Sequence, residues 1–384
     1  MLKEKPRHVR GTKIVVLGTR GFPDVQGGIE THCENLYPHL VKKGYQVVAL
    51  GRMSYVGDDA FYHEGITVLP VRCPKHKFLE TIIHSLKGVF IARKIKCDVL
   101  HIHAVGPALV TPLARLLGMK AVFTHHGADY RRAKWGRVAR LMLRLGECLG
   151  VCFANEVIAI SQAIADYLAD TYKRRVTVIP NGVAPAHAAG TNSILTKHGL
   201  ERGKYVLAVG RFVPEKGFDD LMDSFTEMIN NNGFGDWKLV IAGDADHEDN
   251  YSARLKEKAA GDAHIVLTGF ISGAPLTELY SHAGLFVQPS SHEGLPIALL
   301  EAMSYGLPCI ASDIPAHAGT GLLEKSRLFK KGDAGALTAL LEHALHNPLT
   351  EDEKIHQINT VAERFRWDRI ADETARIYQR LTLS

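Results

Sequence analysis

The stretch KIVVLGTRGFPDVQGGIETHCENLYPHLVKKG, residues 13–44, decides the fold. It begins with a short β-branched run that ends in Gly18, as expected of a strand buried in a parallel sheet. A glycine-rich loop follows, and then a helical stretch from Ile29 to Lys43, which Gly44 ends. A buried strand, a glycine-rich turn and a helix in this order predict the first unit of an α/β domain.

The same alternation recurs along the first half of the chain. Further apolar segments with strand character, mostly separated by helical stretches, are YQVVAL, ITVLPV, DVLHIHA, AVFTHH, EVIAIS and VTVIP. They predict a doubly wound parallel sheet. The pattern restarts at Lys204, where KYVLAVG, WKLVIAG, HIVLTGF, GLFVQP and PCIAS predict five strands of a second α/β domain.

The length of the chain, 384 residues, exceeds what one hydrophobic core usually supports. We assign residues 1–185 to an N-terminal and residues 186–369 to a C-terminal Rossmann-like domain, with the small-residue stretch VAPAHAAGTNS as the linker. The periodic tail, about residues 370–384, is expected to form a helix that packs back on the first domain. Two such domains in tandem face a central cleft between the carboxyl ends of their sheets, where α/β proteins bind ligands.

The composition narrows the class of protein. The chain is 46% hydrophobic and 23% charged. No apolar run approaches the roughly 18 to 20 residues that span a bilayer, and the N-terminus lacks the apolar core of a signal peptide. The six cysteines are scattered and form no CxxC pair, which fits a reducing compartment. We therefore expect a cytoplasmic protein.

Two cations and two carboxylates in the second half carry the strongest functional signal. Arg211 and Lys216 lie in VGRFVPEKGF, and Glu293 and Glu301 lie in HEGLPIALLEAM with seven residues between them. Each pair is placed at the start of a predicted helix. Cations at such a position suit a diphosphate, whereas carboxylates suit sugar and ribose hydroxyls. A ligand that needs both is a sugar nucleotide.

Two candidate sites lie in the first half. Gly27 and Gly28 precede a helix, where glycine lets the backbone approach a ligand and free amides bind anions. His125 and His126 end a predicted strand, and because neighbouring strand residues face opposite ways, at most one is expected to enter the site. No third ligand stands at a suitable spacing, so we expect no metal there.

Together these segments resemble the retaining glycosyltransferases of family 4, which have the GT-B fold. The resemblance covers nearly the whole chain, through the Gly-Gly loop, the HG after a strand, IPNGV, the Arg and Lys pair and the two spaced glutamates. The opening GTRGFPDVQGGIET further resembles a bacterial subgroup associated with rhamnosyl and related transfers to surface polysaccharides. The chain departs from the usual pattern at IAGDADHED and EGLP; since the glutamate spacing survives, the second departure bears on the donor rather than on activity.

The resemblance implies an activity. It implies a metal-independent, retaining hexosyltransferase that uses no cofactor and moves a sugar from a nucleotide-sugar donor, bound by the C-terminal domain, to an acceptor bound by the N-terminal domain. The acceptor is expected to be lipid-linked or a saccharide, in the synthesis of bacterial surface polysaccharide or lipopolysaccharide. Residues implied in catalysis are His126, Arg211, Lys216 and Glu293.

The resemblance also implies the contacts with the donor. Arg211 and Lys216 are expected to hold the diphosphate. Glu293 is expected to bind hydroxyls of the donor sugar, and Glu301 those of the ribose. The remaining implied contacts are Gly27 and Gly28 with the phosphate or sugar, His126, rather than His125, near the sugar and acceptor, and Gly269 and Phe270 with the base.

The charge of the chain is distributed unevenly. Residues 1–185 contain 27 Lys or Arg against 14 Asp or Glu, whereas the remainder contains 19 against 27. The basic excess is centred on RRAKWGRVARLMLRLG, residues 131–146, which as a helix is amphipathic and suits an anionic bilayer on the inner face of the plasma membrane. A solvated face of an ordinary helix is the alternative. The expected membrane contacts are Arg131, Arg132, Lys134, Trp135, Arg137, Arg140 and Arg144.

Other classes of protein stay open or are disfavoured. A sugar-nucleotide epimerase or a phosphorylase could use the same fold, and a catalytically silent partner subunit is a further alternative. A nicotinamide oxidoreductase is disfavoured because no GxGxxG follows the first strand. Nucleic acid is not expected as a partner because no aromatic stacking platform is apparent.

Overall fold

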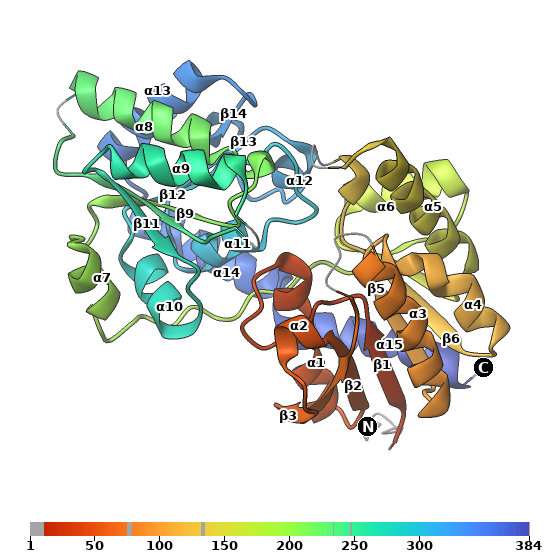
Figure 1. Cartoon of the computed structure of the whole chain (residues 1–384). Coiled ribbons are helices and arrows are strands. Elements are labelled where there is room, and N and C mark those ends of the chain that lie inside the picture. Colours follow the sequence, from red (N-terminus) through yellow and green to blue (C-terminus); the bar gives the residue numbers. More distant parts are fainter. Residues whose placement is uncertain (1–10, 75–78, 132–134, 233, 246–247, 384) are drawn as a thin grey trace, which may run out of the picture. The chain divides into compact units, whose positions relative to one another are not determined.

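The structure is a computed structural model that describes residues 11–74, 79–131, 135–232, 234–245 and 248–383. Within these residues the chain forms two compact α/β units (Figure 1). The first unit runs to Gly182 and resumes at Trp367, and the second unit is Val183–Arg366. The predicted pair of doubly wound parallel-sheet domains is confirmed.

The first unit is built on a sheet that has eight strands over the described residues, in the order β3-β4-β2-β1-β5-β6-β7-β8. Neighbouring strands run parallel, and β3 pairs antiparallel with β4 at one edge. The strand order reverses between β1 and β5, which creates a topological switch point. The strands are β1 (Lys13–Leu17), β2 (Gln46–Arg52), β3 (Phe61–His63), β4 (Ile66–Val71), β5 (Val99–His103), β6 (Lys120–His125), β7 (Glu156–Ala159) and β8 (Thr177–Val178).

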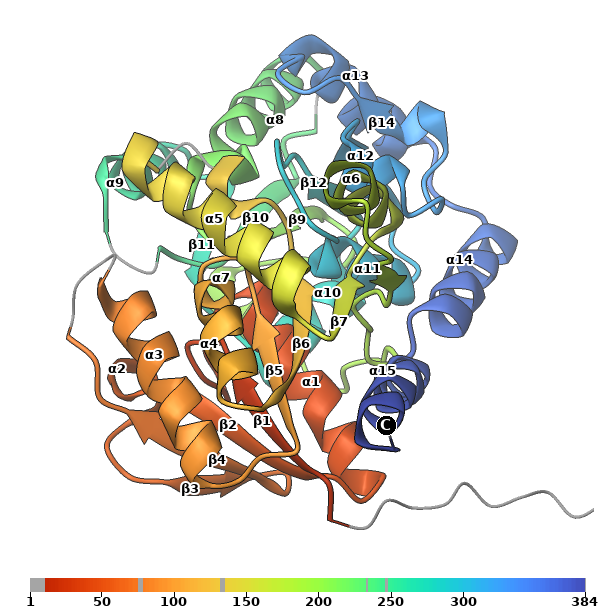
Figure 2. The ribbon, with the colours of Figure 1, turned by 90° about the vertical axis from the view of Figure 1, so that its right-hand side faces the viewer.

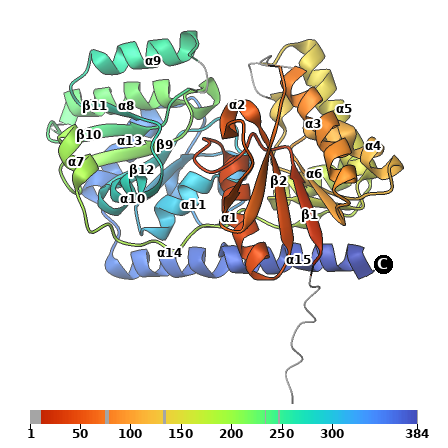
Figure 3. The same ribbon diagram turned by 60° about the horizontal axis from the view of Figure 1, so that its bottom comes forward.

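Helices cover both faces of this sheet (Figures 2 and 3). Side chains alternate along β1, so Ile14 and Val16 pack with α1 and α15, whereas Val15 and Leu17 pack with α3 and α5 on the other face. The helices are α1 (Gly28–Lys42), α2 (Met53–Val56), α3 (Leu79–Lys94), α4 (Thr111–Leu116), α5 (Arg137–Phe153), α6 (Gln162–Tyr172) and α15 (Trp367–Leu383), with 3-10 turns at Pro107–Val110 and Asp129–Arg131.

The last helix, α15, belongs to the core of the first unit although it comes from the other end of the chain. Ile377 and Tyr378 are fully buried in the cluster that also contains α1. The Tyr45 hydroxyl donates to the Ala375 carbonyl at 3.2 Å. The first unit is therefore assembled from two separate stretches of sequence.

The second unit contains a parallel sheet that has six strands in the described residues, in the order β11-β10-β9-β12-β13-β14. Its order reverses between β9 and β12, and this is the switch point of the second unit. Its core is centred on β9, β10 and α8. The strands are β9 (Tyr205–Val209), β10 (Lys238–Ala242), β11 (Ile265–Gly269), β12 (Leu285–Gln288), β13 (Cys309–Ser312) and β14 (Leu328–Phe329).

The helices of the second unit are α7 (Ser193–His198), α8 (Phe218–Asn232), α9 (Asn250–Ala260), α10 (Gly273–His282), α11 (Ile297–Ser304), α12 (Pro315–Ala318), α13 (Ala334–His346) and α14 (Glu351–Arg364), with 3-10 turns at Pro214–Lys216 and Lys325–Arg327. Among the helices of the described residues, we find none with the length and apolar character needed to cross a bilayer.

Candidate functional site

A cluster of charged side chains in the second unit lies where β9 and β12 end. β9 leads through Gly210 and Arg211 to the 3-10 turn Pro214–Lys216 and then to α8. β12 leads into the loop that carries Glu293, before α11 begins. Because β9 and β12 are parallel neighbours at the switch point, both loops emerge at the same edge of the sheet.

Lys216 and Glu293 form an ion pair between these two loops. Lys216 Nζ lies 2.6 Å from Glu293 Oε1, and the side chains are 20% and 14% exposed. The same carboxylate oxygen accepts hydrogen bonds from Gln288 Nε2 at 2.9 Å and from Ser290 Oγ at 2.6 Å. Burial raises the pKa of Glu293, but the Lys216 ammonium and the hydrogen bonds outweigh it and lower the pKa to about 2. Glu293 is therefore an ionised acceptor at physiological pH.

The two loops are held together by close backbone packing. Gly217 has a φ of 65°, and a Cβ on it would lie 2.6 Å from the Pro289 carbonyl oxygen. The Ser291 N–H donates to the Glu215 carbonyl at 2.8 Å. Only glycine fits this approach without displacing the neighbouring strand end. The loop contacts therefore fix the positions from which Lys216 and Glu293 meet.

Glu301 lies in a different environment, inside α11. The Tyr280 hydroxyl donates to Glu301 Oε2 at 3.0 Å. Burial raises the pKa of Glu301 to about 7, and this hydrogen bond only partly opposes the rise. Glu293 is therefore ionised across the neutral range, whereas Glu301 keeps its proton to a higher pH than an ordinary carboxyl group does.

Three further residues expected to contact the donor lie in the second unit. Arg211 is partly exposed and follows the end of β9. Gly269 ends β11 with a φ of 74°, and its carbonyl accepts the Gly243 N–H at 2.9 Å. Phe270 is 43% exposed. The contacts described for Gly269 do not join it to the Lys216 and Glu293 pair, so contact with a base stays a prediction for this strand end.

In the first unit, Gly27 and Gly28 lie where the loop after β1 meets α1. Gly27 has a φ of 154°, and a Cβ on it would lie 2.1 Å from Glu30 Oε2. Glu30 in turn accepts the Arg20 N–H at 3.0 Å and pairs with Arg20 Nε at 3.3 Å. Over the described residues, a Cβ on Gly28 would meet nothing within 4 Å. The sequence predicts the glycines but not the ion pair that braces their loop.

The adjacent histidines His125 and His126 have different partners. His125 Nε2 lies 2.8 Å from Glu147 Oε2, and both side chains are 1% exposed. His126 is partly exposed, and its Nε2 lies 2.9 Å from His103 Nδ1. Glu147 also accepts hydrogen bonds from tyrosine hydroxyls, including Tyr172 at 2.9 Å. His125 is therefore held in a structural network, whereas contact of His126 with a sugar stays a prediction.

Comparison with known proteins matches this architecture. Residues 26–187 match the family described as Glycosyltransferase Family 4, and residues 191–364 match that described as Glycosyl transferases group 1. Sucrose-phosphate synthase from Thermosynechococcus elongatus has a similar structure, with a TM-score of 0.82 at 21% identity over 96% of this chain and 99% of that chain. The chain belongs to the GT-B glycosyltransferases.

Two relatives extend the match in sequence. An uncharacterized glycosyltransferase of Methanocaldococcus jannaschii is 26% identical over 96% of this chain and 98% of its own length. The UDP-Gal:alpha-D-GlcNAc-diphosphoundecaprenol alpha-1,3-galactosyltransferase of Escherichia coli is 30% identical over 64% of this chain and 65% of its own length. The chain is therefore a glycosyltransferase.

The basic segment of this glycosyltransferase is described in part. Arg132 and Lys134 lie outside the described residues, and Arg131 ends a 3-10 turn. Trp135 is partly exposed. On α5 the three arginines are exposed together with four large apolar side chains at helical spacing. These residues are Arg137, Arg140 and Arg144, and Val138, Leu141, Met142 and Leu145.

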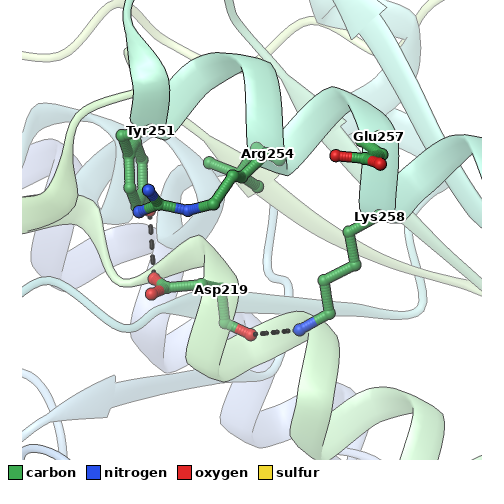
Figure 4. A pocket seen from close by; sticks show the side chains of 6 residues that line it. Asp219, Tyr251, Arg254, Glu257 and Lys258 are labelled. Carbon is green, nitrogen blue, oxygen red and sulfur yellow. Dashed lines mark hydrogen bonds between the residues drawn. The ribbon is translucent and has the colours of Figure 1, made fainter.

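A surface pocket of about 370 Å³ lies between α8 and α9 of the glycosyltransferase (Figure 4). At its floor the Tyr251 hydroxyl donates to Asp219 Oδ1 at 3.0 Å, and Lys258 Nζ donates to the Asp219 carbonyl at 3.3 Å. None of its lining residues is a predicted site residue, and Lys258 forms an ion pair with Asp223, outside the lining, at 2.5 Å. The lining residues are Asp219, Tyr251, Arg254, Leu255, Glu257 and Lys258.

Proposed function

We propose that this enzyme is a retaining, metal-independent glycosyltransferase that moves a sugar from a nucleotide-sugar donor to a lipid-linked or saccharide acceptor in the synthesis of bacterial surface polysaccharide. The observation that carries the proposal is the Lys216 and Glu293 pair at the switch point of the second unit. A cation and an ionised carboxylate 2.6 Å apart suit a ligand that has a phosphate beside a sugar.

The chemistry follows from where charge develops. The bond that breaks joins C1 of the donor sugar to a phosphate oxygen, and negative charge grows on the departing diphosphate. Lys216 and Arg211 lie at the loop that leads into α8, so they stabilise that charge most strongly in the transition state. These fixed cations supply what a metal ion supplies in other transferases. Glu293 accepts hydrogen bonds from the donor sugar and Glu301 from the ribose.

The names of relatives support the choice of donor and acceptor. The Escherichia coli relative is named for a UDP-sugar donor and for an acceptor linked to diphosphoundecaprenol. An acceptor of this kind is anchored in a membrane. We therefore assign a nucleotide sugar to the second unit and a polyprenol-linked saccharide to the first.

A screen of sugar nucleotides in the presence of EDTA tests this function. We expect one donor to stabilise the protein, by about 2.7 kcal/mol at a concentration a hundredfold above its Kd, and to support transfer to a polyprenyl diphosphate saccharide without added metal. NMR of the product is expected to show that the anomeric configuration of the donor is retained.

The same screen separates the alternatives. Formation of an epimer from donor alone identifies an epimerase, and turnover that requires inorganic phosphate identifies a phosphorylase. Donor binding without turnover identifies a silent subunit, and a product of inverted configuration contradicts the retaining mechanism.

We propose further that α5 attaches the enzyme to the inner face of the plasma membrane. Its exposed arginines and apolar side chains occupy one helix, as in helices that lie in a bilayer interface. Anionic lipid fits the arginines by charge, and the apolar stripe fits the acyl boundary. This attachment brings the enzyme to an acceptor that cannot leave the membrane.

Vesicle sedimentation tests the attachment. The enzyme is expected to bind phosphatidylglycerol vesicles more tightly than phosphatidylcholine vesicles, and less tightly as salt rises. The test variant is Leu141→Glu, at a leucine that is 68% exposed. Its binding to phosphatidylglycerol vesicles is expected to weaken at least tenfold, because an apolar contact of about 2 kcal/mol is lost. Leu116→Glu on α4, where the leucine is 83% exposed, is the matched control and should bind as the parent does. Equal loss in both variants contradicts the assignment to α5.

A further inference from the structure

Three histidines from separate elements of the first unit converge. His32 comes from α1, His103 ends β5 and His126 follows β6. One ring nitrogen of each lies within 4.8 Å of one nitrogen of the other two. The His32 ring centroid is 5.5 Å from that of His103 and 4.9 Å from that of His126. The sequence alone does not indicate this cluster because the three residues are far apart along the chain.

One buried nitrogen of the cluster lacks a hydrogen bond of full geometry. His32 is 3% exposed, and its Nδ1 makes no such bond within the part of the chain that the structure describes, although the buried Asn181 side chain is a polar neighbour of the ring. An unsatisfied nitrogen in such a place costs free energy unless a ligand or water fills it. His126 is partly exposed and so provides a route from solvent.

A second shell for one ligand is in place. The Tyr37 hydroxyl lies 2.7 Å from His103 Nε2 and 3.0 Å from His101 Nδ1. A metal ion on His103 Nδ1 requires the proton on Nε2, and the Tyr37 oxygen is placed to accept it. An outer partner of this kind fixes the tautomer and the ring orientation of a metal-binding histidine.

We propose that His32, His103 and His126 form a binding site for a divalent first-row transition-metal ion such as Zn²⁺. Imidazole suits zinc, copper and nickel, whereas Mg²⁺ and Ca²⁺ prefer oxygen. Three histidines around tetrahedral Zn²⁺ have their nitrogens roughly 3.4 Å apart, from Zn–N distances of about 2.0–2.1 Å. The 2.9 Å contact between His103 and His126 thus opens by about half an ångström when the ion enters. The fourth position stays open to water or a ligand.

Titration of the metal-free enzyme with Co²⁺ tests the proposal by a readout independent of glycosyl transfer. We expect the visible absorption bands of tetrahedral Co²⁺ to saturate at one ion per chain, and Zn²⁺ to abolish them. His32→Gln and His103→Gln are each expected to weaken binding at least a hundredfold. Tyr37→Phe, which leaves all three ligands in place, is expected to weaken it about tenfold to a hundredfold.

Controls make the result decisive. His343 and His346 are exposed one turn apart on α13 and could chelate an ion at the surface, so their double replacement by glutamine should leave the bands unchanged. Circular dichroism of the metal-free protein checks that each variant is folded. If His32→Gln or His103→Gln does not fold, His126→Asn, at the partly exposed histidine, is used in its place. Absence of bands, or bands that survive replacement of His32, His103 and His126, overturns the proposal and leaves a hydrogen-bonded cluster only.

Discussion

Lys216→Ala is expected to lower kcat by about a hundredfold to a thousandfold. The Lys216 ammonium is fixed in the 3-10 turn between β9 and α8, where we place the departing diphosphate, so it acts most strongly when the charge is greatest. The loss should appear in kcat as well as in kcat/KM, because the interaction strengthens in the transition state. Steady-state kinetics with saturating donor measure it. Unchanged kcat contradicts the role that we assign to this lysine.

The same substitution has a structural effect that must be separated from catalysis. The Lys216 ammonium lowers the pKa of Glu293 from its ordinary value of 4.5 to about 2. The pair therefore stabilises the fold fully above pH 4.5, and this stabilisation is lost as the pH falls from 4.5 to about 2. Without Lys216, the pKa of Glu293 rises and that contribution disappears at a higher pH. The double variant Lys216→Ala with Glu293→Gln removes the buried charge and is expected to recover stability but not activity.

A matched control exists in the same unit. Lys204 Nζ lies 2.6 Å from Asp236 Oδ2, the same separation as in the Lys216 pair, but on exposed side chains. Exposed pairs contribute little to stability. Lys204→Ala is therefore expected to change neither kcat nor stability measurably. If Lys204→Ala lowers kcat as much as Lys216→Ala does, then loss of any lysine from this unit lowers kcat, and the position of Lys216 is not the cause.

Glu301→Gln is expected to change stability and donor binding in opposite directions. The pKa of Glu301 is about 7, above its unfolded value, so the folded chain holds this proton more tightly than the unfolded chain. The free energy of unfolding therefore falls as pH rises from about 4.5 to about 7. Removing the charge should raise stability at pH 8 by on the order of 2 kcal/mol, with no gain at pH 4.

Donor affinity is expected to fall at least tenfold in the same variant. Ribose hydroxyls donate more strongly to a carboxylate than to an amide oxygen. Thermal unfolding at two pH values and calorimetric donor titration measure the two effects. Glu278→Gln on α10 is the control: hydrogen bonds from Thr191 and the Ile194 N–H lower the pKa of Glu278, so this variant should lose stability at pH 8 and keep its donor affinity. Loss of stability in Glu301→Gln contradicts the proposed sign.

The fold was predictable because its signals are local. Apolar runs that end in glycine or a polar residue predict β9 to β13, since a strand buried on both faces needs such a run. The strand β14, Leu328–Phe329, was not predicted because two residues are too few to show a periodic pattern. The order of apolar runs and helical stretches can be seen in a single sequence, and that order indicates the class of fold.

The site was predictable only where its residues follow a strand. Lys216 and Glu293 lie in segments just before helices. Their partners Gln288 and Ser290 look like ordinary polar residues, although Gln288 ends β12 and Ser290 lies shortly after it. The histidine cluster could not be predicted, because β5, β6 and α1 become neighbours only through sheet order. Spacing along the chain offers no further histidine near His126, whereas the fold brings His32 and His103 beside it.

The return of α15 to the first unit has a consequence for synthesis of the protein. Ile377 and Tyr378 are needed to fill the core beside α1, yet they are translated after the whole of the second unit. The second unit, in contrast, is complete once Arg366 has left the ribosome. The second unit can therefore fold before the first is complete. The early part of the first unit keeps apolar surface uncovered until α15 has been synthesised.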